Sequence, residues 1–284
     1  MDYNFETIKF ELRDDGIGIL SLNRPKSLNA MSFQMIEDLN SIFDHLMINL
    51  DCRVLILRGE GRAFSAGLDI KEAPISQKKR IPEEYSKKFF FLNAPEPIKR
   101  KMYAQWRTGQ IIVKMRKINQ PIIGLIQGAA SGAGFAFINA TDIRIASKSA
   151  KFNNAFIKLG FSGSDLGVSY FLPRHIGMSR AVEILYTGRF FAAEEAEQNG
   201  FILKIVEEEQ LLEAGIELAN NMLSKSPLGL RMTKEAINLS LDAPSLETII
   251  QIENRTQMLC AVSRDVNEGI QSFFEKRNPK YPLR

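Results

Sequence analysis

The sequence predicts an α/β fold, and three observations favour it. Short apolar runs that are typical of buried strands alternate with longer segments in which apolar residues recur at helical spacing. Two of the strand-like runs are followed at once by loops rich in Gly, Ala and Ser. From about residue 207 onward the pattern is helical only. Strands that alternate with helices indicate an α/β domain, followed here by a helical C-terminal region.

Strand and helix signals alternate through the first part of the chain. Residues 7–12 alternate apolar and polar side chains, as a half-buried strand does. Ser32 precedes a helical stripe of apolar residues, and serine is a good N-cap residue. A buried strand is expected at 52–58. Residues 72–103 carry four prolines among many charges, which predicts a mobile loop with helical pieces, and residues 111–118 resume a helix.

The second part of the chain adds further strands and then helices. Residues 122–126 and 143–146 are expected to be strands on either side of a glycine-rich loop. Ser226 followed by Pro227 predicts an N-cap with proline at the first helical position. Ser263 predicts the N-cap of a later helix.

The bulk composition is that of a globular protein. The 284 residues are 45% apolar and 25% charged, and the change to helices divides them into an α/β region, 1–205, and a helical region, 206–284. Cys52 and Cys260 do not have the spacing of a metal site. No apolar run reaches the length of a membrane span. A strand pattern close to the N-terminus leaves no room for a leader, so we expect a cytoplasmic protein.

The positive charge is concentrated in one segment. The net charge of the chain is only +4, but residues 71–117 hold 13 Lys or Arg against 4 Glu, which is +9 for this segment. Such a segment is either a solvated surface or a region that attracts an anionic ligand. No recognised nucleic-acid-binding module accompanies the charge, so nucleic acid is not expected as a partner.

Two loops that follow predicted strands carry the strongest functional signal. Residues 64–71 follow the strand that ends near Leu57, and residues 127–135 follow the strand at 122–126. Backbone can approach a ligand closely where side chains are as small as these. The second loop leads into a helix start, where N–H groups are unpaired and the dipole is positive. Two such loops can direct two backbone N–H groups at one carbonyl oxygen, which is an oxyanion hole.

Together with these two loops, three further segments resemble the crotonase superfamily, the enoyl-CoA hydratases and isomerases. Residues 22–30 are similar to the family's first CoA-contacting turn, 226–236 to its late helix and 274–279 to its tail. The resemblance implies a spiral of ββα units with a C-terminal helical trimerisation region that closes over the ligand. It also implies an acyl-CoA thioester as substrate and a homo-oligomer, either a trimer or a dimer of trimers. No separate cofactor is implied, because the substrate itself carries coenzyme A.

The resemblance assigns the oxyanion hole and the coenzyme A contacts to particular residues. The N–H of Leu68, just after the loop glycine, is the first donor, and the N–H of Ala133 is the second. These two amides would stabilise the enolate oxygen that forms at the thioester carbonyl. The residues expected to contact coenzyme A are Lys26, Ser27, Leu28, Ala66, Asp69, Ile70, Lys71 and Lys276.

The two glutamates that handle water in the hydratases of this family are missing. The first of these positions falls on Ala136 and the second on Phe156, and neither side chain can transfer a proton. General acid and base groups contribute about 100- to 10,000-fold each. Ordinary two-glutamate hydration of an enoyl-CoA is therefore not expected. By resemblance, Ala136 and Phe156 line the acyl pocket with Ser164 and Phe273.

Asp165 is the best surviving candidate for a base. It lies in a glycine-rich segment, 160–167, which resembles the part of the family that lines the acyl end of the pocket, where dienoyl-CoA isomerases carry a functional aspartate. Apolar neighbours are expected to raise the pKa of this carboxyl and to make it a base near neutral pH. An aspartate can equally cap or tie down a glycine-rich turn, so the sequence leaves both roles open.

Three hypotheses of function remain. The leading one is an acyl-CoA enzyme with hydratase-, isomerase- or hydrolase-like chemistry and Asp165 as its base. The second is a non-catalytic acyl-CoA-binding protein, which the loss of both glutamates favours. The third is a Clp-like serine peptidase, because the segment around Ser131 is also similar to the Clp nucleophile segment. A serine nucleophile needs a histidine base, and His175, the next histidine along the chain, is expected in a turn.

Overall fold

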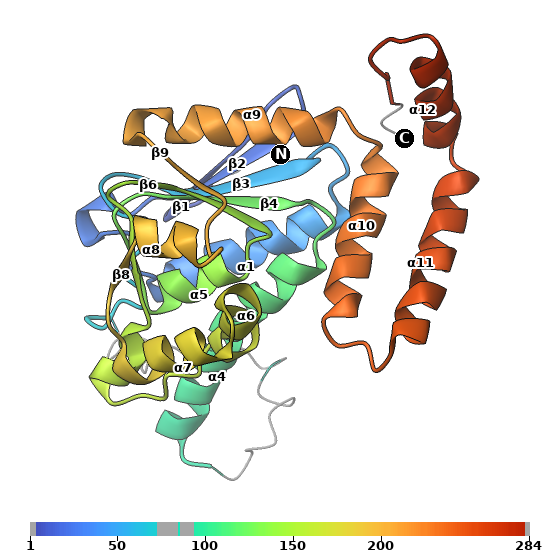
Figure 1. The fold of residues 1–284 in the computed structure, drawn as a ribbon. Helices are drawn as coiled ribbons and strands as arrows, with labels where there is room; N and C mark the ends of the chain where they lie inside the picture. The colour runs from blue at the N-terminus through green and yellow to red at the C-terminus, as the bar shows by residue number, and fades with distance from the viewer. Residues whose placement is uncertain (1–3, 73–84, 86–93, 282–284) are drawn as a thin grey trace.

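The centre of the computed structural model, which describes residues 4–72, 85 and 94–281, is a six-stranded sheet (Figure 1). Its strand order is β1-β2-β3-β4-β6-β9; β1 and β2 are antiparallel, and the other neighbouring strands are parallel. Three short strands form a second sheet in the order β5-β7-β8. The strands are β1 Ile8–Leu12, β2 Ile17–Leu22, β3 Val54–Gly59, β4 Ile122–Ile126, β5 Ala129–Ser131, β6 Ile143–Ser147, β7 Lys151–Asn153, β8 Phe191–Ala192 and β9 Lys204–Val206.

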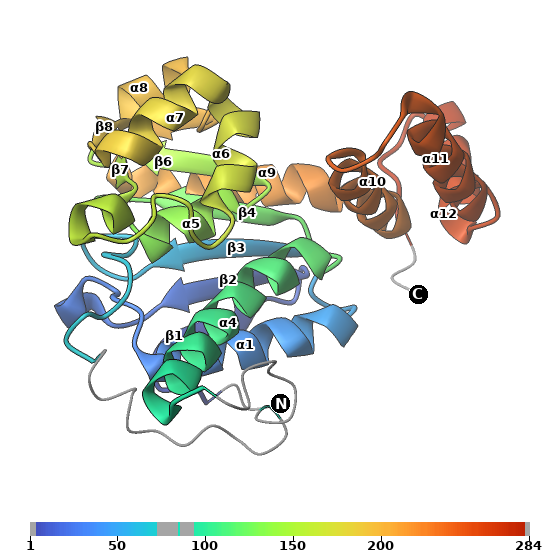
Figure 2. The same cartoon turned by 90° about the horizontal axis from the view of Figure 1, so that it is seen from below.

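Helices cover both faces of the six-stranded sheet, with α1 and α4 on one face and α9 on the other (Figures 1 and 2). In β3, Leu55 and Leu57 pack into the core on the α1 side, whereas Val54 and Ile56 pack with residues of α9. All four are completely buried, as a sheet covered on both faces requires. The helices described as far as residue 223 are η1 Pro25–Ser27, α1 Phe33–Ile48, α4 Glu96–Lys117, α5 Ala133–Asn139, η2 Ala155–Leu159, α6 Val168–Ile176, α7 Met178–Thr187, α8 Ala193–Gln198, η3 Glu208–Gln210 and α9 Leu211–Leu223.

Several helix starts agree with the sequence predictions. Ser32 caps α1, since its Oγ accepts a hydrogen bond from Met35 N at 3.1 Å. Ser226 caps the helix that begins at Pro227, accepting from Gly229 N at 2.9 Å. Ser263 also precedes a helix, but its hydroxyl donates to a carbonyl of the preceding helix instead of capping the next one.

Two local predictions need correction. Residues 72–103 were expected to be a loop with helical pieces, but from Glu96 onward the chain forms one unbroken helix, α4, that continues to Lys117. Pro95 and Pro97 lie at its N-terminus, where proline breaks no helical hydrogen bond. The rest of that segment, 73–84 and 86–93, lies outside the described residues. His175 lies in the last turn of α6 and not in a turn between elements.

The last three helices stand beside the sheet (Figures 1 and 2). They are α10 Pro227–Ser240, α11 Leu246–Ala261 and α12 Arg264–Phe274. The predicted boundary at residue 206 coincides with the end of β9, the last strand, but α9 beyond it still covers the sheet, so the part that stands apart begins with α10. None of the described helices combines the length and apolar character needed to cross a membrane.

Candidate active site

Three loops meet at the edge of the sheet where β2, β3 and β4 end. Met31 N, after β2, donates to Gly67 O, after β3, at 2.8 Å. Ser65 N donates to Ala129 O at 3.0 Å, and Ser131 N donates to Ser65 O at 2.9 Å. These backbone hydrogen bonds continue the parallel ladder beyond the strands and fix the positions of the loops. Ligands bind at this carboxyl edge in open α/β sheets.

The two predicted donor amides both follow a glycine in the left-handed region. Gly67, with φ 94°, precedes Leu68, and Gly132, with φ 51°, precedes Ala133 at the start of α5. Within the described residues, neither the Leu68 N–H nor the Ala133 N–H has a hydrogen-bond acceptor. Ala133 is completely buried, and an unpaired amide inside a protein is rare. Together with the Leu68 N–H on the adjoining loop, it marks a place where a ligand oxygen can bind.

Gly67 keeps the space beside the second amide open. A Cβ at this position would lie 2.8 Å from Ser131 O and 3.3 Å from Ala133 N, and the positive φ would strain it further. Ala133 is completely buried, whereas Leu68 is 38% exposed. The pair of amides therefore extends from the interior to the protein surface, an arrangement that suits a two-donor oxyanion hole.

The positions of the two missing glutamates lie next to the second amide. Ala136 is buried one turn further along α5, and its N–H donates to Gly132 O at 3.0 Å. Phe156, in η2, is 6% exposed, and a Cβ on Gly132 would lie 3.8 Å from its Cε1. The protein beside the Ala133 amide is therefore apolar on these two sides, with no group that can move a proton.

Asp165 lies between η2 and α6, and its two carboxylate oxygens differ. Oδ1 accepts from Leu166 N at 2.8 Å and from the side-chain amide of Gln105 on α4. Oδ2 has no hydrogen-bond partner in the described part of the chain. Burial raises the pKa of Asp165 above its usual value, against the opposing effect of the two hydrogen bonds. The direction of this pKa agrees with the prediction. One oxygen ties the turn, and the other is unbonded within the described residues, so both roles that the sequence left open for Asp165 remain.

Ion pairs that the motifs do not reveal join residues 22–30, the turn expected to contact coenzyme A, to the loop after β3. Arg24 Nη1 lies 2.9 Å from Asp69 Oδ2, and Arg24 Nη2 lies 3.3 Å from Glu72 Oε1. Asp69 Oδ1 also accepts from Lys71 N at 3.1 Å. Arg24 and Asp69 therefore hold the two segments together, and the spacing of the motifs alone does not identify this contact.

The other predicted coenzyme A contacts lie on the surface around these segments. Leu28 O accepts from Ala66 N at 2.9 Å, which seats the first turn on the loop. The side chains of Lys26, Ser27, Ile70 and Lys71 are exposed. Those four side chains are free to meet a ligand.

The structure does not bring the remaining predicted residues to the two amides within one chain. Phe273 is 79% exposed on α12, and Lys276 follows it on the same exposed surface. Both views show α12 well apart from α5 (Figures 1 and 2). Ser164 is exposed, and its N–H donates to Ser162 Oγ at 3.0 Å, so the Ser162 hydroxyl satisfies the backbone of this turn.

Part of the positive segment is neutralised within the protein. Arg107 lies 2.6 Å from a carboxylate oxygen of α1, and Lys114 lies 2.7 Å from another. Arg116 of the same helix lies 2.7 Å from a carboxylate oxygen of Asp142, which is also outside the segment. The +9 charge predicted from the sequence therefore overstates the positive field around this part of α4.

His175 is engaged elsewhere and does not pair with Ser131. Its Nε2 donates to Asn139 O at 3.1 Å, so the neutral ring carries its hydrogen on Nε2. The ring packs against Phe171 and Phe201. Burial, together with the nearby Arg144 guanidinium, lowers its pKa to about 4. The geometry gives the peptidase hypothesis no base, and the described residues contain no cluster of His, Cys, Asp or Glu suited to a metal ion.

His175 should make the protein sensitive to mild acid. Its pKa falls from 6.5 in the unfolded chain to about 4 in the fold, so its contribution is complete above pH 6.5 and is lost as the pH falls toward 4. The free energy of unfolding should drop by roughly 2 kcal/mol between pH 7 and pH 5 from this residue. Urea unfolding of His175→Gln, which keeps a donor but does not titrate, should show a drop smaller by that amount. Equal drops in both proteins would contradict the assignment.

The fold and the paired amides define a class of protein, the crotonase-type acyl-CoA proteins. The sequence profile of the Enoyl-CoA hydratase/isomerase family matches residues 13–283. The chain belongs to this family.

Individual members of the family are similar to this chain over nearly its whole length. The chain is 35% identical over 268 residues to the probable enoyl-CoA hydratase EchA12 of Mycobacterium tuberculosis H37Rv, covering 93% of this chain and 89% of the relative. It is 32% identical to the 1,2-epoxyphenylacetyl-CoA isomerase of Escherichia coli K12, covering 94% and 95%. The crystal structure of a putative enoyl-CoA hydratase from Streptomyces coelicolor A3(2) superposes with a TM-score of 0.87 at 31% identity, covering 99% and 96%.

Proposed function

We propose that this protein is an acyl-CoA enzyme that holds the thioester oxygen on the N–H groups of Leu68 and Ala133. The proposal rests on two backbone N–H groups without an acceptor, which lie on adjoining loops. Each belongs to the residue directly after a glycine with positive φ. In this role the amides stabilise the negative charge that develops on the thioester oxygen when an α-proton leaves. No separate cofactor takes part, because the backbone itself supplies the electrostatic stabilisation.

Asp165 is the proposed group that moves the proton, and the chemistry is therefore of the isomerase type. Its free Oδ2 can accept a proton, and burial raises its pKa above the usual value, which makes the carboxylate a stronger base. The apolar side chains at Ala136 and Phe156 leave no pair of carboxylates to activate water. Relatives named as an enoyl-CoA hydratase and as an isomerase both act, by their names, on CoA thioesters.

The alternative is a protein that binds acyl-CoA without turning it over. It is favoured by the same apolar pair, Ala136 and Phe156, next to the second amide. The discriminating experiment is proton exchange at the α-carbon of butyryl-CoA in deuterated buffer, followed by nuclear magnetic resonance. Exchange that depends on the protein supports the enzyme; saturable binding without exchange selects the alternative.

Reversing the charge of Lys71 should weaken binding of coenzyme A esters. This lysine is exposed on the loop that carries Leu68, and a cation there attracts the phosphates of the ligand more strongly at low salt. Calorimetry of Lys71→Glu with butyryl-CoA should show a lower affinity than the wild type, with a difference that shrinks as salt is added. Equal affinities at low salt would show that Lys71 does not contact the ligand.

We also propose that the helical tail assembles the protein into a trimer or a dimer of trimers. Large apolar side chains remain exposed along α11 and α12, and exposed apolar patches mark surfaces where another protein packs. Light scattering at micromolar concentration should therefore give a trimer or a hexamer, and a monomer mass would contradict this. The most exposed of these side chains are Leu246, Met258, Val262, Phe273 and Phe274.

A further inference from the structure

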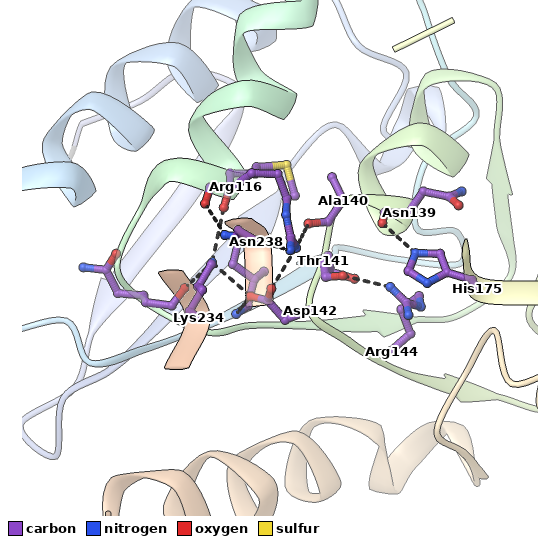
Figure 3. A network of polar contacts seen from close by, with 12 residues as sticks. Arg116, Asn139, Ala140, Thr141, Asp142, Arg144, His175, Lys234 and Asn238 are labelled. Atoms are coloured by element: carbon purple, nitrogen blue, oxygen red, sulfur yellow. Dashed lines mark hydrogen bonds and ion pairs between the residues drawn. The ribbon is translucent and has the colours of Figure 1, made fainter. Parts of the chain in front are cut away.

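A chain of polar contacts joins α10 to the end of α5 (Figure 3). Its first member is Lys234 on α10, whose side chain is 6% exposed. The Lys234 Nζ lies 2.9 Å from Asp142 Oδ2, 2.7 Å from Gln120 O and 3.3 Å from Met115 O. The three acceptors match the three hydrogens of an ammonium group. All three hydrogens of this buried ammonium group therefore have acceptors, one at the end of α4, one at Gln120 just beyond it and one on Asp142.

Asp142, which binds Lys234, also forms an ion pair with Arg116 of α4. Arg116 Nη1 donates to Asp142 Oδ1 at 2.7 Å and to Ala140 O at 3.1 Å. Asp142 Oδ2 also accepts from Ile122 N at 2.8 Å, which fixes the carboxylate against β4. Asn238 of α10 accepts from Arg116 Nη2 and donates to Arg116 O at 2.8 Å. The helix α10 thus holds Arg116 both at its guanidinium and at its backbone.

The far end of this chain is the helix that begins with Ala133. Ala140, which Arg116 contacts, is the C-cap residue of α5, and Ala133 is its first residue. The helix has seven residues, which is about two turns. A helix this short moves as one unit, so a displacement at Ala140 displaces the Ala133 amide as well.

Two other contacts hold the same end of α5 from within the core. His175 Nε2 donates to Asn139 O at 3.1 Å, and Arg144 Nη1 donates to Thr141 O at 2.8 Å (Figure 3). Within the described residues, neither of these side chains forms a hydrogen bond or ion pair with α10. Arg116 differs, because its other hydrogen-bond partners lie on α10 or bind Lys234 directly, although its guanidinium also lies over the Phe171 ring of α6. It is therefore the contact through which α10 can influence α5.

We propose that Arg116, Asp142 and Lys234 are positioning residues that couple the seating of α10 to the placement of the Ala133 amide. The inference rests on the proposed role of that amide in binding the thioester oxygen. Hydrogen bonds weaken steeply as their distance and angle depart from the optimum. Breaking a buried ion pair leaves a charge without compensation, so the loss of Lys234 should loosen Asp142 and Arg116 as well.

The test reads the strength of the hydrogen bonds to the bound thioester. Butyryl-CoA labelled with carbon-13 at the thioester carbonyl is bound at saturation, and infrared difference spectroscopy gives the frequency of its C=O stretch. In the wild type, the two amides should lower this frequency relative to free butyryl-CoA. In Lys234→Met, which removes the charge but retains much of the bulk, about half of this lowering should be lost, because one of the two donors is displaced. Saturation removes the influence of any change in affinity.

The controls separate coupling from general loosening of the tail. Asp142→Asn should lose part of the frequency shift in the same way as Lys234→Met. The matched variant Asp242→Asn removes a carboxylate just after α10 that contacts Tyr170 and Arg174 of α6. Within the described residues, Asp242 has no direct contact with α5 or with Arg116. This variant should keep the full shift. If Lys234→Met does not fold, Asn238→Ala, which removes a neutral contact with Arg116, replaces it and should also lose part of the shift.

Two results would overturn the coupling while leaving the proposed function intact. One is an equal frequency shift in the wild type and in the folded variant, either Lys234→Met or Asn238→Ala. The other is a loss in Asp242→Asn as large as the loss in Asp142→Asn. A wild-type protein that binds butyryl-CoA with no frequency shift would overturn the proposed role of the amides, and the coupling with it.

Discussion

Asp165→Asn should abolish exchange of the α-protons of bound butyryl-CoA while leaving binding nearly intact. Asparagine keeps an oxygen at the Oδ1 position, so the hydrogen bonds from Leu166 N and Gln105 can persist. Only the free oxygen, Oδ2, is replaced by an amide nitrogen that cannot accept a proton. A general base contributes about 100- to 10,000-fold, so the exchange rate should fall to the background of the buffer. Nuclear magnetic resonance in deuterated buffer measures the rate, and calorimetry measures the affinity.

The matched control for this variant is Asp44→Asn. Asp44 is an exposed aspartate on α1 that pairs with Lys114, so the same chemical change is made away from the two amides. Its exchange rate should equal that of the wild type. If Asp165→Asn also exchanges at the wild-type rate, Asp165 is a residue of the turn, and its hydrogen bond from Leu166 N is its whole role.

Hydration of crotonyl-CoA by the wild type should be several orders of magnitude slower than by a relative that retains both glutamates. The loss of each general acid or base costs about 100- to 10,000-fold, although two such losses do not simply add in free energy. Ala136 and Phe156 are both buried next to the Ala133 amide. Neither side chain carries a carboxylate that could activate water there. The decrease in absorbance of the enoyl thioester measures the rate. A kcat/KM equal to that of the two-glutamate relative would contradict the isomerase-type proposal.

Local sequence signals predicted most of the sheet but not where the helices end. The strand at 122–126 is observed with the predicted bounds, because a run of isoleucine and leucine, interrupted only by Gly124, lies between Pro121 and a glycine-rich loop. The start of α4 was missed because prolines in a charged segment resemble a loop, and proline is also well tolerated at a helix N-terminus. His175 was misplaced for a related reason, since Pro173 lies within α6.

The backbone of the candidate site was more predictable than its side chains. Glycine followed by Leu68 or Ala133 is a local pattern, and the positive φ before each amide depends on that glycine. Gln105 and Arg24 were missed because they act across long separations, to Asp165 and to Asp69. The same holds for the buried group around Lys234. Such contacts depend on how α4 and α10 pack on the sheet, which no single segment encodes.

The most direct test of the central claim is a crystal structure of the protein with butyryl-CoA bound. We expect the thioester oxygen within about 3 Å of both the Leu68 and Ala133 nitrogens. We also expect the α-carbon of the acyl group to face the Asp165 carboxylate. A thioester oxygen hydrogen-bonded to neither amide, in a fully occupied complex, would contradict the claim.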